Sequence, residues 1–207
     1  MYIIGITGSV ASGKSTIATQ MAKELNCKVV STDSFLYTNS ELTMRNLQDR
    51  KGFPESYDVA ALREFLTKLA DGLPQKVPVY SHKSFDILPD VMTEYENCEQ
   101  LILEGVGIGL VRDLISRLIF LDVDLGVAYK WYKLRYEKMI NCSRTDPDSY
   151  FHQFVDLNPE VIEEFGRDTW ININEKNYFK NILPLKDSAD EVWTIDDQHI
   201  VLNKEFF

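Results

Sequence analysis

The chain has 207 residues and 44% of them are apolar, which is enough to bury a sizeable core and argues against a disordered or low-complexity protein. Its net charge of −10 disfavours a protein that binds nucleic acid through the phosphate backbone. No apolar run approaches the roughly 20 residues that span a bilayer. We therefore expect a single folded domain over residues 1–207 that binds neither nucleic acid nor a membrane.

The three cysteines, Cys27, Cys98 and Cys142, are far apart in the chain and form no C-x-x-C pair. An odd number of cysteines with no metal-like spacing is typical of reduced thiols, so we expect a cytoplasmic protein. The chain enters a strand-like run at Tyr2, and we expect no signal peptide.

That first run, residues 2–7, is apolar and β-branched and predicts a buried strand. It leads into the pattern G-x-x-x-x-G-K-S and then into a helical pattern that ends near Leu25. Glycine lets the loop curl around a phosphate, and the N–H groups at the start of a helix attract an anion. Lys14 would contact the β- and γ-phosphates of ATP, and the Ser15 hydroxyl would ligate Mg²⁺.

An ordinary Gly-rich turn is the alternative, but the complete motif in its strand–loop–helix setting favours nucleotide binding. The predicted nucleotide-binding residues are Gly8, Ser9, Val10, Ala11, Ser12, Gly13, Lys14, Ser15 and Thr16.

A second buried strand is predicted at residues 27–32, and Asp33 follows it directly. In a parallel α/β sheet the chemistry gathers at the carboxyl ends of the strands, so this carboxylate could act on a nucleophile that approaches the γ-phosphate. The alternative is a helix N-cap, a position that Asp also favours. Residues 38–58 are interpreted as a polar connection, and Asp58 as the N-cap of a helix that begins at Val59.

Residues 77–82 form a short extended stretch in which Pro78 excludes a central strand. Residues 84–87 continue it, and a polar segment leads out. We interpret this region as a small β-excursion that forms a rim around the site. His82 could bind a ligand there, or it could hold a turn, which is the commoner role of a lone histidine.

The third buried strand, residues 101–104, ends in Glu104, and a fourth is predicted at 118–123. Strands that alternate with helices imply a doubly wound, mostly parallel α/β sheet, here of the P-loop NTPase type. A carboxylate at the end of the third strand could order Mg²⁺ and its water shell. The alternative is a carboxylate that faces solvent.

A helix is predicted from Leu125 to Ile140, with Tyr132, Arg135 and Met139 on one face. A basic, aromatic helix at this place suits a lid over the triphosphate, where Arg135 would neutralise charge in the transition state. The alternative is a solvated charged face with buried aromatic residues. Two closing strands are predicted at 190–195 and 199–202.

Several of these stretches, in this order along nearly the whole chain, resemble the bacterial type I pantothenate kinases. The stretches are GSVASGKST from Gly8, TDSFLY from Thr32, KGFPESYD from Lys51, PVYSH from Pro78, WY at Trp131, DPDSYFH from Asp146 and NILP from Asn181. Many kinases share the phosphate loop, whereas KGFPESYD and DPDSYFH are far more specific.

The resemblance implies an ATP- and Mg²⁺-dependent transfer of phosphate to the primary hydroxyl of pantothenate by a cytoplasmic homodimer. Asp33 would be the catalytic base, with Lys14 and Arg135 serving ATP and the transferred group. The residues implied to line the pantothenate pocket, besides Asp33, are Tyr80, His82, Tyr132, Asn174 and, at a position usually occupied by Tyr, Phe85.

The chain also departs from the family pattern. The family usually has a helical segment before the first strand. Thr19 replaces an arginine that helps to bind inhibitory coenzyme A, and Met139 replaces an aromatic residue, so feedback inhibition is expected to differ. Phe85 lacks a pocket hydroxyl, which can change the preferred substrate. A kinase of another small alcohol, such as a nucleoside, and a nucleotide-binding regulatory protein therefore stay open as alternatives.

Overall fold

The computed structural model describes all residues from 1 to 207. Its central sheet has six strands in the order β2-β5-β1-β6-β7-β8. Neighbouring strands from β2 to β7 are parallel, and β8 pairs antiparallel with β7 at the edge. The strands of this sheet are β1 Tyr2–Gly8, β2 Lys28–Ser31, β5 Gln100–Glu104, β6 Arg117–Val123, β7 Glu191–Ile195 and β8 Val201–Phe206. The predicted mostly parallel sheet and the closing hairpin are both confirmed.

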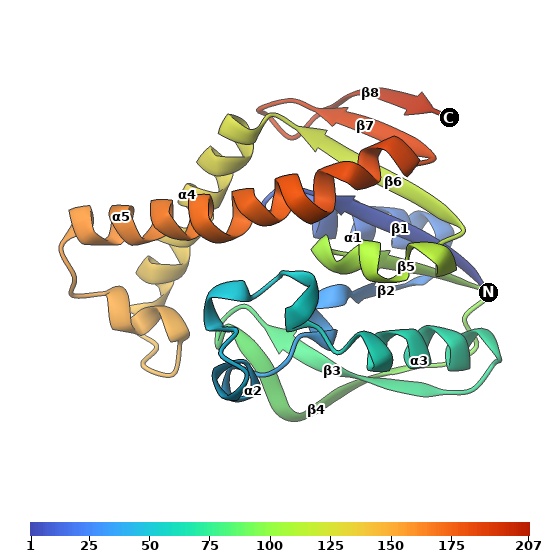
Figure 1. Cartoon of the computed structure of the whole chain (residues 1–207), viewed down its shortest axis with the longest axis horizontal. Helices are drawn as coiled ribbons and strands as arrows, with labels where there is room; N and C mark the ends of the chain where they lie inside the picture. The colour runs from blue at the N-terminus through green and yellow to red at the C-terminus, as the bar shows by residue number, and fades with distance from the viewer.

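Helices cover both faces of this sheet (Figure 1). The α-helices are α1 Lys14–Leu25, α2 Asn39–Met44, α3 Val59–Ala70, α4 Leu125–Ser143 and α5 Pro159–Thr169. The 3₁₀ segments are Thr32–Phe35, Gln48–Arg50, Pro54–Ser56, Val106–Leu114, Tyr150–Phe154 and Leu183–Ser188, and π-helical turns continue α5 at Trp170–Glu175 and Tyr178–Ile182. None of the helices combines the length and the apolar character that crossing a bilayer requires.

Two apolar clusters fill the space between the sheet and its helices, one on each face. Alternate residues of β5 divide between them, since Leu101 and Leu103 pack on the face covered by α3, and Ile102 packs on the face covered by α1. Strands buried on both faces read as continuous apolar runs, which explains the sequence pattern. The carboxyl ends of the parallel strands lie at the left edge in Figure 1, towards α4 and α5.

The small β-excursion is a separate two-stranded antiparallel hairpin of β3, Gln75–Ser81, and β4, Asp86–Tyr95. The prediction of a small β-excursion is confirmed, but the prediction that it gives way to a polar segment after residue 87 is wrong, because β4 runs on to Tyr95. Most residues of β4 are exposed, so apolar and polar residues do not alternate along it. The sequence therefore lacks the pattern that predicts a strand.

The interpretation of residues 38–58 as a plain connection is also wrong, because α2 and two 3₁₀ segments lie within it. Helix α2 begins with a capping box, in which the Thr38 hydroxyl accepts from the Glu41 amide and the Glu41 carboxylate accepts from the Thr38 amide. The N-cap at Asp58 is confirmed, since its Oδ1 accepts from the Ala61 amide at 2.9 Å.

Candidate active site

The loop between β1 and α1 has glycines at two positions with backbone conformations that other residues rarely adopt. Gly8 has φ of 148°, and a Cβ at this position would lie 2.6 Å from the carbonyl oxygen of Leu121 in the neighbouring strand β6. Gly13 has φ of 87° and caps the start of α1. The strand, the loop and the helix are therefore held in the arrangement that the motif predicts.

Lys14 points back over this loop. Its ammonium group donates to the carbonyl oxygens of Ser9 at 2.7 Å and Gly8 at 3.3 Å. Burial lowers the pKa of Lys14 to about 8, although the charges of Glu104 and Asp33 act to raise it. The hydroxyls of Ser9 and Ser12 are buried without a hydrogen-bond partner. The loop therefore offers unsatisfied polar groups and a buried cation, which suit a phosphate.

Ser15 and Glu104 form a pair of oxygen donors beside the loop, where the Ser15 hydroxyl donates to Glu104 Oε1 at 3.2 Å. Glu104 is buried at the end of β5, and this burial raises its pKa. The alternative of a solvent-facing carboxylate is therefore wrong. Mg²⁺ takes oxygen ligands and is usually held by one or two protein groups together with substrate phosphates, so this pair fits the ion.

Asp33 lies just beyond the end of β2, in a 3₁₀ segment. The cap of this segment is Ser31, whose hydroxyl accepts from the Asp33 amide at 3.3 Å, so the interpretation of Asp33 as an N-cap is wrong. The Tyr57 hydroxyl lies 3.5 Å from Asp33 Oδ1. The Asp33 charge acts on the pKa of ionisable groups from four parts of the chain: Lys14, Lys51, Tyr57, Tyr80, His82 and Glu104.

Tyr80 and His82 come from the end of β3 and the turn that follows it. Their rings lie edge to face with centroids 5.3 Å apart. Burial, and then the charge of Asp33, raises the pKa of Tyr80. Burial lowers the pKa of His82, the charge of Asp33 acts to raise it, and the charges of Arg135 and Lys51 act to lower it, with a net lowering. The hairpin therefore presents a neutral phenol and a histidine biased towards its neutral form on the side of Asp33.

Helix α4 contributes Tyr132 and Arg135. Tyr132 is buried against Trp170, with ring centroids 5.3 Å apart, and burial raises its pKa to about 12. Arg135 is exposed, yet its charge lowers the pKa of both Lys14 and His82. The alternative, a solvated charged face, describes another side of the same helix, where Lys133 forms an exposed ion pair with Glu163 of α5 at 2.7 Å.

Phe85 and Asn174 lie at the margin of this group. Phe85 is the last residue of the β3–β4 turn and stacks on Tyr150, with ring centroids 5.1 Å apart. Asn174 lies on the π-helical turn that also carries Trp170, and its amide makes no hydrogen bond to the other predicted site residues. The structure thus brings Lys14, Asp33, Tyr80, His82 and Arg135 near one another, with Phe85 beside Tyr80, whereas Asn174 makes no hydrogen bond to any of them.

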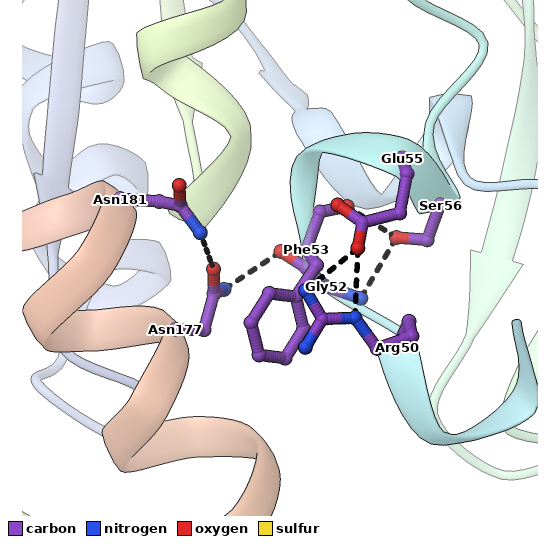
Figure 2. Close-up of polar contacts among 7 residues, drawn as sticks. All are labelled: Arg50, Gly52, Phe53, Glu55, Ser56, Asn177 and Asn181. Atoms are coloured by element: carbon purple, nitrogen blue, oxygen red, sulfur yellow. Dashed lines mark hydrogen bonds and ion pairs between the residues drawn. The ribbon is translucent and has the colours of Figure 1, made fainter.

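The sequence interpretation gave no role to Lys51 or Asn177. The ammonium group of Lys51 lies near Asp33 and Asp86, and burial lowers its pKa to about 8. Figure 2 shows Asn177 reaching from its helix to the loop after Lys51, where its Nδ2 donates to the Gly52 carbonyl at 2.7 Å. Asn181 in turn donates to Asn177 Oδ1 at 2.8 Å. The only sequence signal for Lys51 was the KGFPESYD stretch that begins with it, and no quoted motif contains Asn177.

Comparisons with known proteins identify the family of the chain. Residues 3–137 match the family described as phosphoribulokinase / uridine kinase. Pantothenate kinases of Brucella abortus (strain S19) and Brucella suis (strain 1330) are each 36% identical to the chain over 222 aligned positions, covering 97% of this chain and 69% of the relative.

Solved structures share the fold at low identity. The D-glycerate 3-kinase from Cryptococcus neoformans var. grubii is 14% identical with a TM-score of 0.68, covering 100% of this chain and 89% of that one. The phosphoribulokinase from Rhodobacter spheroides is 14% identical with a TM-score of 0.57, covering 95% of this chain and 72% of that one.

Proposed function

Because the chain belongs to the phosphoribulokinase / uridine kinase family and, within it, to the pantothenate kinases, we propose that it transfers the γ-phosphoryl group of ATP to the primary hydroxyl of pantothenate. This reaction is the first step towards coenzyme A. The residue roles below follow from this proposal.

The observation that carries the proposal is the position of Asp33 between two groups of residues. Its charge acts on Lys14 of the phosphate loop and on Tyr80 and His82 of the hairpin. A carboxylate in that position can accept the proton of an acceptor hydroxyl while the hydroxyl oxygen attacks the γ-phosphorus.

The mechanism that we propose is an in-line displacement. Asp33 takes the proton from the acceptor hydroxyl, and the new oxygen–phosphorus bond forms as the bond between the γ-phosphorus and the bridging oxygen of ADP breaks. Lys14 and, from α4, Arg135 neutralise the charge that develops on the phosphoryl oxygens. Ser15 and Glu104 would hold Mg²⁺, which supplies further neutralisation of the β- and γ-phosphates when bound.

The acceptor pocket in this proposal is lined by residues of the hairpin and the lid. Tyr80, His82 and Tyr132 would direct polar groups towards the hydroxyls, amide and carboxylate of pantothenate, with Asn174 beside them. Phe85 contributes an apolar wall. A site that hydrogen-bonds its substrate rejects analogues that leave those polar groups unpaired, so the pocket should discriminate among small alcohols.

A substrate panel tests this function. ADP release is measured with ATP and Mg²⁺ alone and then with pantothenate, uridine or D-glycerate. We expect pantothenate to accelerate ADP release far more than the others. Acceleration by another alcohol instead would assign a different acceptor to the same apparatus, and nucleotide binding without any acceleration would favour a regulatory protein.

We also propose that the protein is a homodimer and is cytoplasmic, as the family resemblance implies. Light scattering behind a size-exclusion column tests the first point, since a homodimer has twice the chain mass of 23.9 kDa. A monomer across the micromolar range would contradict it.

A further inference from the structure

Phe85 has an unusual backbone conformation. Its φ is 53°, in the left-handed region that glycine and asparagine adopt readily and that a bulky aromatic residue rarely does. Such a residue persists only where its surroundings hold it, and residues of this kind gather at functional sites. The contacts around Phe85 therefore indicate which residues hold its backbone and where its ring is placed.

Two side chains from distant segments hold the Phe85 carbonyl oxygen. Lys51 Nζ donates to it at 2.5 Å and Asn39 Nδ2 at 3.1 Å. The two donors also bind each other, since Lys51 Nζ donates to Asn39 Oδ1 at 2.7 Å. The backbone N–H of Asn39 donates to Asp86 Oδ1 at 3.0 Å, which holds the first residue of β4 as well. Asn39 thus contacts every other member of this network.

The network places the Phe85 ring between the hairpin and the lid. The ring centroid lies 6.3 Å from that of Tyr80 on β3 and 5.1 Å from that of Tyr150 beyond α4. Lys51 Nζ lies 4.4 Å from the same ring centroid, so the cation that holds the backbone also lies over the ring. A change of φ at Phe85 would move the ring away from both partners.

We propose that Asn39 is a positioning residue for the acceptor pocket, which with Lys51 holds Phe85 in its left-handed conformation and so sets the apolar wall between Tyr80 and Tyr150. This inference rests on the proposed function for its kinetic consequence. Asn39 makes no hydrogen bond to Asp33 or to the phosphate loop and approaches Asp33 only through Lys51, so we expect its loss to act mainly on binding of the acceptor.

A double-mutant cycle tests the proposal. Asn39→Ala removes one of the two donors to the Phe85 carbonyl and the acceptor that holds the other donor, Lys51. Phe85→Ala removes the ring that is positioned, and the two variants are made singly and together. We expect Asn39→Ala to raise the KM for pantothenate about tenfold in the wild-type background. In the Phe85→Ala background the same substitution should raise it less than about twofold. The KM for ATP should be unchanged in both backgrounds. An equal effect in both backgrounds would show that Asn39 does not act through the ring and would overturn the proposal.

The matched control is Ser40→Ala, an exposed neighbour on α2 that should leave all constants unchanged. The Asn39→Ala protein should fold, because the capping box of α2 uses Thr38 and Glu41 and not Asn39.

Hydrogen–deuterium exchange separates this inference from the proposed function. Exchange in the turn at residues 82–87 should rise in Asn39→Ala and not in Ser40→Ala, while exchange in β1 stays unchanged. This result is expected even if pantothenate proves not to be the acceptor. Unchanged exchange in the turn would overturn the positioning role by itself.

Discussion

The phosphate loop and the acceptor side of the site are built in different ways. The loop is a contiguous run between β1 and α1, and its shape is set by backbone geometry, as at Gly8, where any Cβ would meet the Leu121 carbonyl. The acceptor side is assembled from the hairpin, the lid and the loop after α2, and side-chain contacts such as Asn39–Phe85 and Asn177–Gly52 join these pieces. Asp33 lies between the two.

The difference explains how one fold can serve several substrates. A loop fixed by its own backbone tolerates little change, whereas a pocket made of side chains from several segments can be altered one segment at a time. A D-glycerate 3-kinase and a phosphoribulokinase share the present fold at 14% identity, as this view expects. Substitutions on the two sides should therefore have separable effects.

The largest effect should come from the residue that serves both sides. Asp33→Asn keeps the shape of the side chain but removes the proton acceptor, so turnover should fall about 10²- to 10⁴-fold. Affinity for ATP, measured by calorimetry, should stay the same. Unchanged turnover would remove Asp33 from the role of base.

Lys14→Ala should affect the phosphate side. Loss of the cation over the loop should lower turnover about 10²- to 10³-fold and weaken ATP binding together with it. Steady-state kinetics and ATP titration provide the two readings. Lys23→Ala, an exposed lysine in the last turn of the same helix, is the matched control and should change neither. A fully active Lys14→Ala protein would overturn the assignment of the loop.

The pH dependence of nucleotide binding should report on the same lysine. The pKa of Lys14 is lowered to about 8 in the free protein, and bound phosphates raise it, so binding takes up a proton above that pH. Affinity for ATP should be constant below about pH 8 and then fall by up to about tenfold per pH unit. Calorimetry from pH 7 to 10 measures this, and the dependence should vanish in Lys14→Ala. An equal slope in that variant would assign the titration elsewhere.

The smallest effect should come from Asn177→Ala on the acceptor side. The buried Asn177 amide joins the C-terminal helical segment to the loop that carries Lys51 (Figure 2). Its loss leaves the Gly52 carbonyl and Asn181 without their partner and should lower the free energy of unfolding by about 1–3 kcal/mol. Urea denaturation measures this loss, and the exposed Asn172→Ala on the same segment is the control.

The KM for pantothenate should rise in Asn177→Ala with the KM for ATP unchanged. A rise in both KM values would mean that the two sides are not independent.

The sequence predicted the strand, loop and helix of the phosphate side because the information for them is local. One motif contains Gly8, Gly13, Lys14 and Ser15. The buried strands β1, β5 and β6 are recognisable in the sequence as apolar runs. The placement of Asp33 and Glu104 at strand ends follows from the rule for parallel sheets.

The acceptor side was predicted mainly through the family resemblance. Helix α2 was missed although Thr38 and Glu41 have the spacing of a capping box. The contacts of Lys51 with Phe85 and of Asn177 with Gly52 join residues 34 and 125 positions apart, and no local pattern encodes such a pair. The left-handed conformation of Phe85 could not be predicted either, because phenylalanine rarely adopts it.

The most direct test of the account follows the phosphate itself. The protein is incubated with ATP labelled at the γ-phosphorus, Mg²⁺ and pantothenate, and the products are separated and identified by mass spectrometry, with Asp33→Asn as the parallel control. The account predicts label on the primary hydroxyl of pantothenate with the wild-type protein and almost none with the variant. Label that stays in ATP or appears only as inorganic phosphate would contradict it.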